Sequence, residues 1–230
     1  WSQWNDGSVF YNADVVHTLG QDWKCTIVRA AMGTDDGWGG GCIHNPVLEQ
    51  NKVEAIVDAA IEEGIYVIID WHSHHAEDEE EEAKKFFTDM DQKYGQYPNV
   101  MYEVYNEPLQ VDWTSDIKPY AEAVLDTIRF YDTDNSVIVG TSNWSQDVDA
   151  AALNPIVDNN VAYTLHYYAA SHQESLREKA QLALNRGIPL FVTEYGTCDA
   201  SGDGAIDEVE SRIWWDFLAE RDISWCNWSV

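Results

Sequence analysis

Two glutamates that each end a short apolar run could together carry out hydrolysis. Glu107 follows the run Val100–Tyr105, and Glu194 directly follows Leu190–Thr193. Hydrolysis of a glycosidic bond requires such a pair, because one carboxyl group protonates the departing oxygen while the other attacks or stabilises an oxocarbenium-like centre. Either glutamate alone could equally cap a helix or join a salt bridge, whereas two of them at strand ends favour a catalytic pair.

Polar and aromatic residues also end the other predicted strands, which is where catalytic groups collect in a parallel barrel. These ends carry Arg29, Asp70-Trp71-His72, Asn106, Asn143-Trp144, His166-Tyr167-Tyr168 and Asn227-Trp228. A structural core has no use for so many ionisable groups at one edge of a sheet, so we interpret the cluster as an active site. The 11 Trp and 12 Tyr exceed the needs of one core and could offer flat surfaces to sugar rings.

The elements that must position these residues alternate between β-branched runs and helical patterns. The predicted strands are Cys25–Arg29, Ile65–Asp70, Val100–Val104, Val137–Gly140, Val161–Leu165, Leu190–Thr193 and Ser224–Trp228. The predicted helices cover 13–19, 53–61, 77–94, 117–128, 174–185 and 208–220. Such alternation is typical of right-handed crossovers between parallel strands. Since no Pro/Ser-rich linker divides the chain, residues 1–230 form a single domain, either an open doubly wound sheet or a barrel that lacks adjacent terminal elements.

Several segments, in order along the chain, resemble glycoside hydrolase family 5. Val104-Tyr105-Asn106-Glu107-Pro108-Leu109 is similar to the acid/base motif of that family, and Val192-Thr193-Glu194-Tyr195-Gly196-Thr197 is similar to its nucleophile strand. The similarity continues through 28–33, 67–72, 144–148 and 165–169 and is strongest to bacterial-type endo-β-1,4-glucanases, that is, cellulases. It implies an α/β fold of the TIM (β/α)8 type, here incomplete, with seven recognisable strands and without the first barrel strand and the last helix.

The resemblance implies an endo-acting, retaining enzyme that hydrolyses β-1,4-glucosidic bonds in cellulose or related β-glucans. Glu107 would be the general acid/base and Glu194 the nucleophile, with their carboxyl groups about 5–5.5 Å apart. Two alternatives remain open: the same fold and mechanism acting on β-mannan or mixed-linkage glucan, and an inactive carbohydrate-binding remnant of the barrel. No cofactor and no metal is implied, and we interpret His74, His75 and the acidic loop 199–207 as solvated loop residues.

The resemblance also implies seven residues that bind substrate or support the two glutamates: Arg29, His72, Asn106, Trp144, His166, Tyr168 and Trp228. Arg29 and Tyr168 would contact Glu194, and His166 would tune Glu107. Asn106 would hold the sugar 2-hydroxyl, and His72 would contact other hydroxyls. Trp228 would form the floor beneath the cleaved sugar and Trp144 would stack a sugar on the leaving-group side, while Trp1 and Trp4 would border the non-reducing side.

The charge balance narrows the range of partners. With 41 acidic and 13 basic residues the formal charge is −28, which disfavours nucleic acid and anionic membrane surfaces. No stretch approaches the roughly 18 to 20 uncharged apolar residues of a membrane span. Such an acidic surface suits a saline habitat or an acidic extracellular enzyme, so we expect a secreted protein that acts on a polysaccharide.

The cysteines and the strand count give two further expectations. Cys42 and Cys198 lie in polar, glycine-containing loops and are the more plausible disulfide, whereas Cys25 and Cys226 lie in apolar runs and are expected to be buried thiols. A seven-strand barrel would leave the first and last predicted strands with open edges. We expect this seam to be closed by self-association, by partner strands or by tightening of the seven strands.

Overall fold

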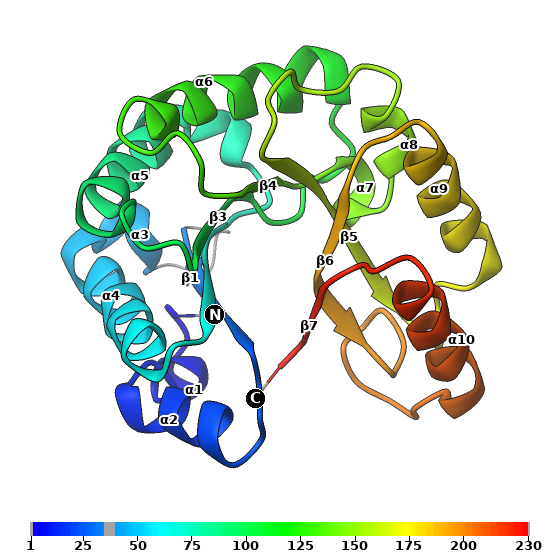
Figure 1. Cartoon of the computed structure of the whole chain (residues 1–230), viewed down its shortest axis with the longest axis horizontal. Coiled ribbons are helices and arrows are strands. Elements are labelled where there is room, and N and C mark those ends of the chain that lie inside the picture. The colour runs from blue at the N-terminus through cyan, green and yellow to red at the C-terminus, as the bar shows by residue number, and fades with distance from the viewer. Residues whose placement is uncertain (1, 35–39, 230) are drawn as a thin grey trace.

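The computed structural model describes residues 2–34 and 40–229, and in them seven parallel strands form one sheet in the order of the chain (Figure 1). The strands are β1 (Ile27–Gly33), β2 (Tyr66–His72), β3 (Val100–Tyr105), β4 (Val137–Val139), β5 (Val161–Tyr168), β6 (Leu190–Gly196) and β7 (Trp225–Asn227). A doubly wound sheet reverses its strand order at a switch point, and this sheet does not. The α/β barrel of the TIM type is therefore confirmed, and the open-sheet alternative was wrong.

Helices surround the sheet on its outer side (Figure 1). They are α1 (Asn5–Ser8), α2 (Ala13–Gln21), α3 (Gly41–His44), α4 (Pro46–Glu63), α5 (Glu80–Tyr94), α6 (Lys118–Arg129), α7 (Ser142–Ser145), α8 (Val148–Ala151), α9 (Glu174–Asn185) and α10 (Glu208–Ala219), with a 3-10 turn η1 (Ala76–Asp78) and a π turn η2 (Trp113–Ile117). Every helix predicted from periodicity is present. The four short helices α1, α3, α7 and α8 were missed, because a single turn carries no periodic signal.

Five strands, β1, β2, β3, β5 and β6, extend further toward the carboxyl edge of the sheet than the sequence predicted. All seven residues of β1 pair with β2, from Ile27 opposite Tyr66 to Gly33 opposite His72. The strands β5 and β6 likewise continue to Tyr168 and Gly196. Polar residues at these ends resemble a loop in the sequence, but the parallel hydrogen-bond ladder holds them in extended backbone. The carboxyl edge of the barrel is therefore built on strand rather than on loop.

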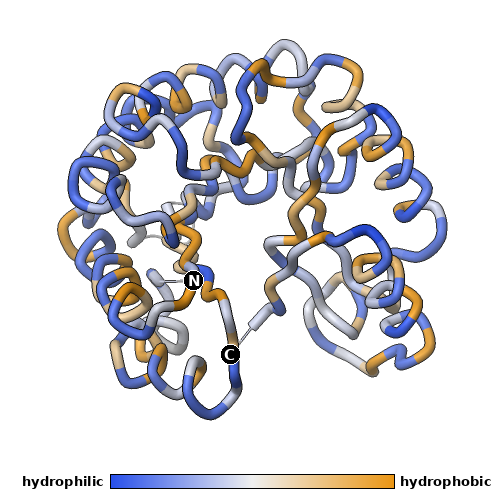
Figure 2. Tube along the Cα trace, viewed as in Figure 1, coloured by the Kyte–Doolittle hydropathy of each residue, from blue (hydrophilic) through white to orange (hydrophobic). Residues whose placement is uncertain are grey.

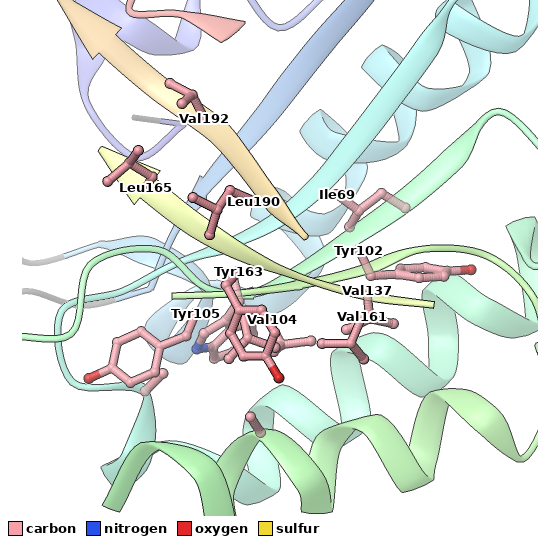
Figure 3. Close-up of a cluster of buried hydrophobic side chains, with 14 of the residues drawn as sticks. Ile69, Tyr102, Val104, Tyr105, Val137, Val161, Tyr163, Leu165, Leu190 and Val192 are labelled. Carbon is pink, nitrogen blue, oxygen red and sulfur yellow. The ribbon is translucent and has the colours of Figure 1, made fainter. Parts of the chain in front are cut away.

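The main core lies between the sheet and the helices. Side chains such as Ile69, Val104 and Val192 leave the strands toward the helices and are fully buried (Figure 3). A smaller cluster, formed by Ile68, Ile138 and Cys226, fills the inside of the barrel. Figure 2 shows apolar segments along the strands, whereas apolar and hydrophilic segments alternate along the surrounding helices. The alternation of side chains along each strand thus separates the packed outer layer from the barrel interior.

The barrel is nearly closed, because β1 and β7 lie side by side (Figure 1). In the described part of the chain no hydrogen-bonded ladder joins these two strands. Side chains span the seam instead: the indole of Trp228 stacks on the ring of His72 at 5.4 Å and lies 5.9 Å from the guanidinium carbon of Arg29. Self-association, partner strands and tightening of the seven strands were the three expected ways to close the seam. Within this single chain, the seven strands tighten until β1 and β7 nearly meet.

The disulfide prediction was wrong, because all four cysteines are free. Cys42 lies in α3, after β1, and Cys198 follows β6, so β7 separates the two positions around the barrel. A disulfide needs its two Cα atoms within about 7 Å of each other, and the intervening strand prevents that approach. Cys226 is buried as predicted, and burial raises the pKa of its thiol to about 12.

Within the described residues, no helix combines the length and the apolar character that crossing a membrane would require.

Candidate active site

Glu107 and Glu194 meet inside the barrel at the carboxyl ends of β3 and β6. A carboxylate oxygen of each and a ring nitrogen of His166 all lie within 4.8 Å of one another. Glu194 is buried and Glu107 is partly buried, so both carboxyl groups are shielded while still reaching a cavity. The structure therefore brings the two predicted glutamates together at the close spacing that a direct attack on the anomeric carbon requires.

A bulge in β6 turns two consecutive side chains inward. Phe191 pairs with Thr164 and Glu194 with His166, so two residues of β6 stand opposite one residue of β5. As a result both Thr193 and Glu194 point into the barrel, although neighbours on a regular strand point to opposite faces. A similar irregularity lies in β3 between Glu103 and Tyr105, directly before Glu107. Each of the two glutamates thus lies at or just after a local break in the ladder that redirects the side chains.

Glu194 accepts hydrogen bonds from two side chains on different strands. Nη1 of Arg29 donates to its Oε2 at 3.1 Å, and the hydroxyl of Tyr168 donates to its Oε1 at 2.7 Å. Bonds of this kind stabilise the ionised carboxylate and fix its orientation. The two residues predicted to support Glu194 therefore both contact it.

Arg29 is also the centre of a buried charge cluster. Its Nε donates to Glu103 at 2.7 Å, and its Nη2 donates to Asn106 at 2.6 Å and lies 3.0 Å from Asp70 Oδ2. Burial raises the pKa of both Asp70 and Glu103 to about 7, although the guanidinium opposes that rise. Sequence reasoning missed Glu103 as a site residue. The available signal was an acidic residue inside an otherwise apolar strand.

Asn106 is oriented so that its amide nitrogen has no hydrogen-bond partner. Its Oδ1 is taken by Arg29, whereas its buried Nδ2 donates to no other described residue. A buried donor without an acceptor is costly unless a ligand supplies one. The free N–H groups at the end of β3 are therefore available to a hydroxyl of a bound sugar.

Glu107 lies between two imidazoles. Oε1 is 2.9 Å from Nδ1 of His166, and Oε2 is 3.3 Å from Nε2 of His74. Burial raises the pKa of Glu107, but the hydrogen bonds of the two histidines lower it by more when their rings are protonated. His166 was predicted in this role. His74 was interpreted as a solvated loop residue, which was wrong, because the chain turns after β2 and brings its ring back to the carboxyl group.

His72 and Trp228 form a paired surface at the seam. Nδ1 of His72 lies 2.7 Å from Oδ2 of Asp70, and its ring is parallel to the indole of Trp228 within 8°. Burial lowers the pKa of His72 well below its usual value, so the ring is neutral. These contacts fix a flat aromatic surface beside the two glutamates.

Trp144 lies in a left-handed turn on the opposite side of the site. Asn143, Trp144 and Ser145 have φ values of 60°, 55° and 56°. The backbone N–H groups of Asn143 and Trp144 donate to the carbonyls of Leu109 and Pro108, both at 2.8 Å. This unfavourable backbone conformation persists because it fastens the Trp144 platform to the segment that carries Glu107.

A cavity of about 400 Å³ opens at this edge of the barrel. Its lining comprises Glu107, Asn143, Trp144, Gln146, His166, Tyr168, His172, Glu194 and Ala200. Five of the predicted site residues therefore share one cavity. Trp4 is largely exposed and is not among the described residues that line it, and Trp1 lies outside the described residues.

Comparison with known proteins assigns the chain to one protein family. A family model described as "Cellulase (glycosyl hydrolase family 5)" matches residues 2–230. Endoglucanase Z of Dickeya dadantii (strain 3937) is 54% identical over 97% of this chain and 52% of its own length. The chain spans about half the length of the curated relatives it matches.

Solved structures agree with this grouping. A structure from Cytophaga hutchinsonii is 55% identical with a TM-score of 0.96, over 100% of this chain and 74% of that one. The catalytic domain of Thermobifida fusca endoglucanase Cel5A, solved as a variant in complex with cellotetraose, is 35% identical with a TM-score of 0.87, over 94% of this chain and 72% of that one.

Proposed function

The chain belongs to the cellulase family, glycosyl hydrolase family 5, and from this premise we propose that it is an endo-acting glucanase that cleaves β-1,4-glucosidic bonds with retention of configuration. The observation that carries the proposal is the close approach of the Glu107 and Glu194 carboxyl groups, within 4.8 Å at their nearest ligand atoms. An inverting enzyme needs about 6.5–9.5 Å between its carboxyl groups to admit a water molecule.

In the first step, the Glu194 carboxylate attacks the anomeric carbon while Glu107 donates its proton to the departing oxygen. Arg29 and Tyr168 hold the attacking carboxylate in place until the glycosyl ester forms. In the second step, the Glu107 carboxylate takes a proton from water, and the resulting hydroxide attacks the anomeric carbon and releases Glu194. The same side chain thus acts as acid and then as base.

The remaining predicted residues would bind the sugar around this centre. The unpartnered Nδ2 of Asn106 is suited to the 2-hydroxyl, a contact that strengthens in the transition state. The stacked pair of His72 and Trp228 would lie beneath the cleaved sugar. Trp144, across the cavity, would stack the sugar that departs.

The substrate we propose is a β-1,4-glucan, since a 35% identical relative was solved with cellotetraose bound. The test measures reducing-sugar release from carboxymethyl cellulose and from β-mannan, for this chain and its Glu107→Gln and Glu194→Gln variants. We expect glucan cleavage that is lost in both variants. Preferential cleavage of mannan would favour the alternative polymer, and binding without cleavage of either polymer would favour a carbohydrate-binding remnant.

We infer that the seam between β1 and β7 also supports self-association. Its support is the lack of a ladder between these strands in the described residues, together with the exposed indoles of Trp215 and Trp225 beside it. Light scattering over a range of concentrations tests this idea, and Trp225→Lys should shift the protein toward the monomer. A mass of one chain at every concentration would exclude it.

We infer that the protein acts outside the cell, because an insoluble glucan cannot cross a membrane to reach an enzyme inside. The net charge of −28 supports this inference, since it keeps a protein dispersed in open solution. Immunodetection in the culture medium and in washed cells of the source tests it. Recovery of the protein only from the cells would contradict it.

A further inference from the structure

We propose that Glu103, acting through Thr193, is a positioning residue that holds His166 in the tautomer that keeps a proton on Glu107. The inference rests on the proposed function, because it concerns the acid step of that reaction. It adds to the site two buried residues that never reach the substrate.

An unbroken chain of hydrogen bonds links Glu103 of β3 to Glu107, just after that strand, through residues of β5 and β6. Glu107 Oε1 is 2.9 Å from His166 Nδ1, and His166 Nε2 is 2.8 Å from Thr193 Oγ1. Thr193 Oγ1 is in turn 2.6 Å from Glu103 Oε1. His166, Thr193 and Glu103 are all buried, so no water competes for these contacts. The bulge in β6 is what allows Thr193 to enter this chain beside Glu194.

The hydroxyl of Thr193 has only one proton, so it couples Glu103 to the tautomer of His166. When Glu103 is ionised, Thr193 donates to it and Nε2–H of His166 donates to Thr193. The Nδ1 of His166 is then bare and accepts from protonated Glu107, which is the acid that the first step needs. When Glu103 is protonated, each bond reverses, and Nδ1–H of His166 donates to the Glu107 carboxylate.

The two arrangements contain the same atoms and the same total charge. To pass from the first to the second, the proton of Glu107 moves to Nδ1, that of Nε2 moves to Thr193, and that of Thr193 moves to Glu103. In hydrolysis the first arrangement gives one proton to the departing oxygen. The Glu107 carboxylate then faces a bare ring nitrogen, and this repulsion between lone pairs favours recovery of a proton from the attacking water.

Two opposing effects act on the protonation of Glu103. Nε of Arg29 is 2.7 Å from Glu103 Oε2 and stabilises the carboxylate, whereas burial favours the neutral acid and raises the pKa of Glu103 to about 7. Other titratable groups face the chain from each strand around it: Asp70 and His72 of β2, His74 after β2, and Glu194 of β6. Arg29 is the cation in direct contact with Glu103, so the ionised form of Glu103 depends on it.

The barrel supplies a matched control for Thr193. Thr164, on β5, also donates a hydrogen bond to Glu103 Oε1, at 3.1 Å, and is fully buried. It is not on the path to His166. Thr164→Val and Thr193→Val therefore remove the same hydroxyl and the same contact with Glu103, but only the second breaks the chain.

The first experiment measures the pH dependence of kcat/KM on a soluble β-1,4-glucan. In Glu103→Gln the amide oxygen must accept from Arg29, so the amide NH2 faces Thr193 and forces Nδ1–H of His166 toward Glu107. We expect the basic limb to move to lower pH by about one unit, which is a tenfold loss above that limb. Thr193→Val should show a similar shift, Thr193→Ser should restore the limb, and Thr164→Val should leave it in place.

The second experiment uses 2,4-dinitrophenyl β-cellobioside, whose leaving group departs without a proton. Loss of acid catalysis then costs little, so Glu103→Gln and Thr193→Val should stay within about twofold of the unsubstituted chain. If their role were only structural, both substrates would lose activity to the same degree. Basic limbs that coincide for Thr193→Val and Thr164→Val would overturn the inference while leaving the proposed function intact. If the unsubstituted chain cleaves no glucan, the proposed function itself fails.

Discussion

The substitution Tyr168→Phe isolates one hydrogen bond to the proposed nucleophile. The hydroxyl of Tyr168 donates to Glu194 Oε1 at 2.7 Å, and the change removes this single oxygen. A hydrogen bond to a charged group contributes about 1.5–3 kcal/mol. Because the bond fixes the orientation of the Glu194 carboxylate, its loss weakens the attack.

The magnitude follows from the conversion of free energy into rate. A tenfold change in rate corresponds to about 1.4 kcal/mol, so kcat/KM should fall by about 10- to 100-fold. The assay measures kcat/KM on soluble cellulose across the pH range.

The neighbouring Tyr167 provides the control. Its buried hydroxyl has no hydrogen-bond partner among the described residues, and its ring stacks on Trp214 at 4.0 Å. Tyr167→Phe should therefore leave the pH profile unchanged and leave stability unchanged or higher, since it removes an unsatisfied polar atom. An unchanged kcat/KM in Tyr168→Phe would refute the argument that this bond holds Glu194 in position for attack.

Three further predictions concern other parts of the molecule. Trp228→Ala should lower kcat/KM on cellopentaose by about tenfold, because it removes the surface that Trp228 forms with His72. Circular dichroism spectra check that the barrel is intact. An unchanged kcat/KM would show that Trp228 is not part of the site. Sodium chloride at 1 M should raise the midpoint of thermal unfolding by about 2–4 °C, because it screens a net charge of −28, and a fall in the midpoint would contradict this reasoning. Burial raises the pKa of Asp91 from 3.8 to about 6, so folding favours the protonated form and stability is lost as the pH rises through that range. The variant Asp91→Asn should therefore unfold at a higher urea concentration than the unsubstituted chain at pH 7.5, but not at pH 4. An equal gain in stability at both pH values would point to a different cause.

Local sequence patterns predicted most of the backbone. The helix α9 has the predicted bounds, α10 ends one residue earlier than predicted, and α6 is shifted by one residue at both ends. Such elements are predictable because apolar residues must recur at the helical period to face the sheet. The first strand was displaced, from Cys25–Arg29 to Ile27–Gly33, because pairing with β2 rather than local composition fixes where the ladder lies.

The site was predicted in outline because strand ends are visible in a sequence. All seven supporting residues lie near Glu107 or Glu194, or line the cavity and seam beside them. His74 was missed because it lies in the irregular segment after β2, and no periodicity encodes the path that brings its ring to Glu107. The wrong Cys42–Cys198 pairing has a related cause, since loop composition does not reveal that β7 stands between the two positions.

The sequence by itself determined that seven strands alternate with helices and that two glutamates end two of those strands, because both properties are local in the chain. Only the tertiary structure decided how the side chains at those ends meet. The bulge at Thr193 turns two neighbours to one face, and the contact of Thr193 with Glu103 joins residues 90 positions apart. The seam is likewise a contact between distant parts of the chain, because the curvature of the whole sheet brings β1 and β7 together. Such contacts arise from the summed geometry of all the strands, and no short stretch of sequence contains them.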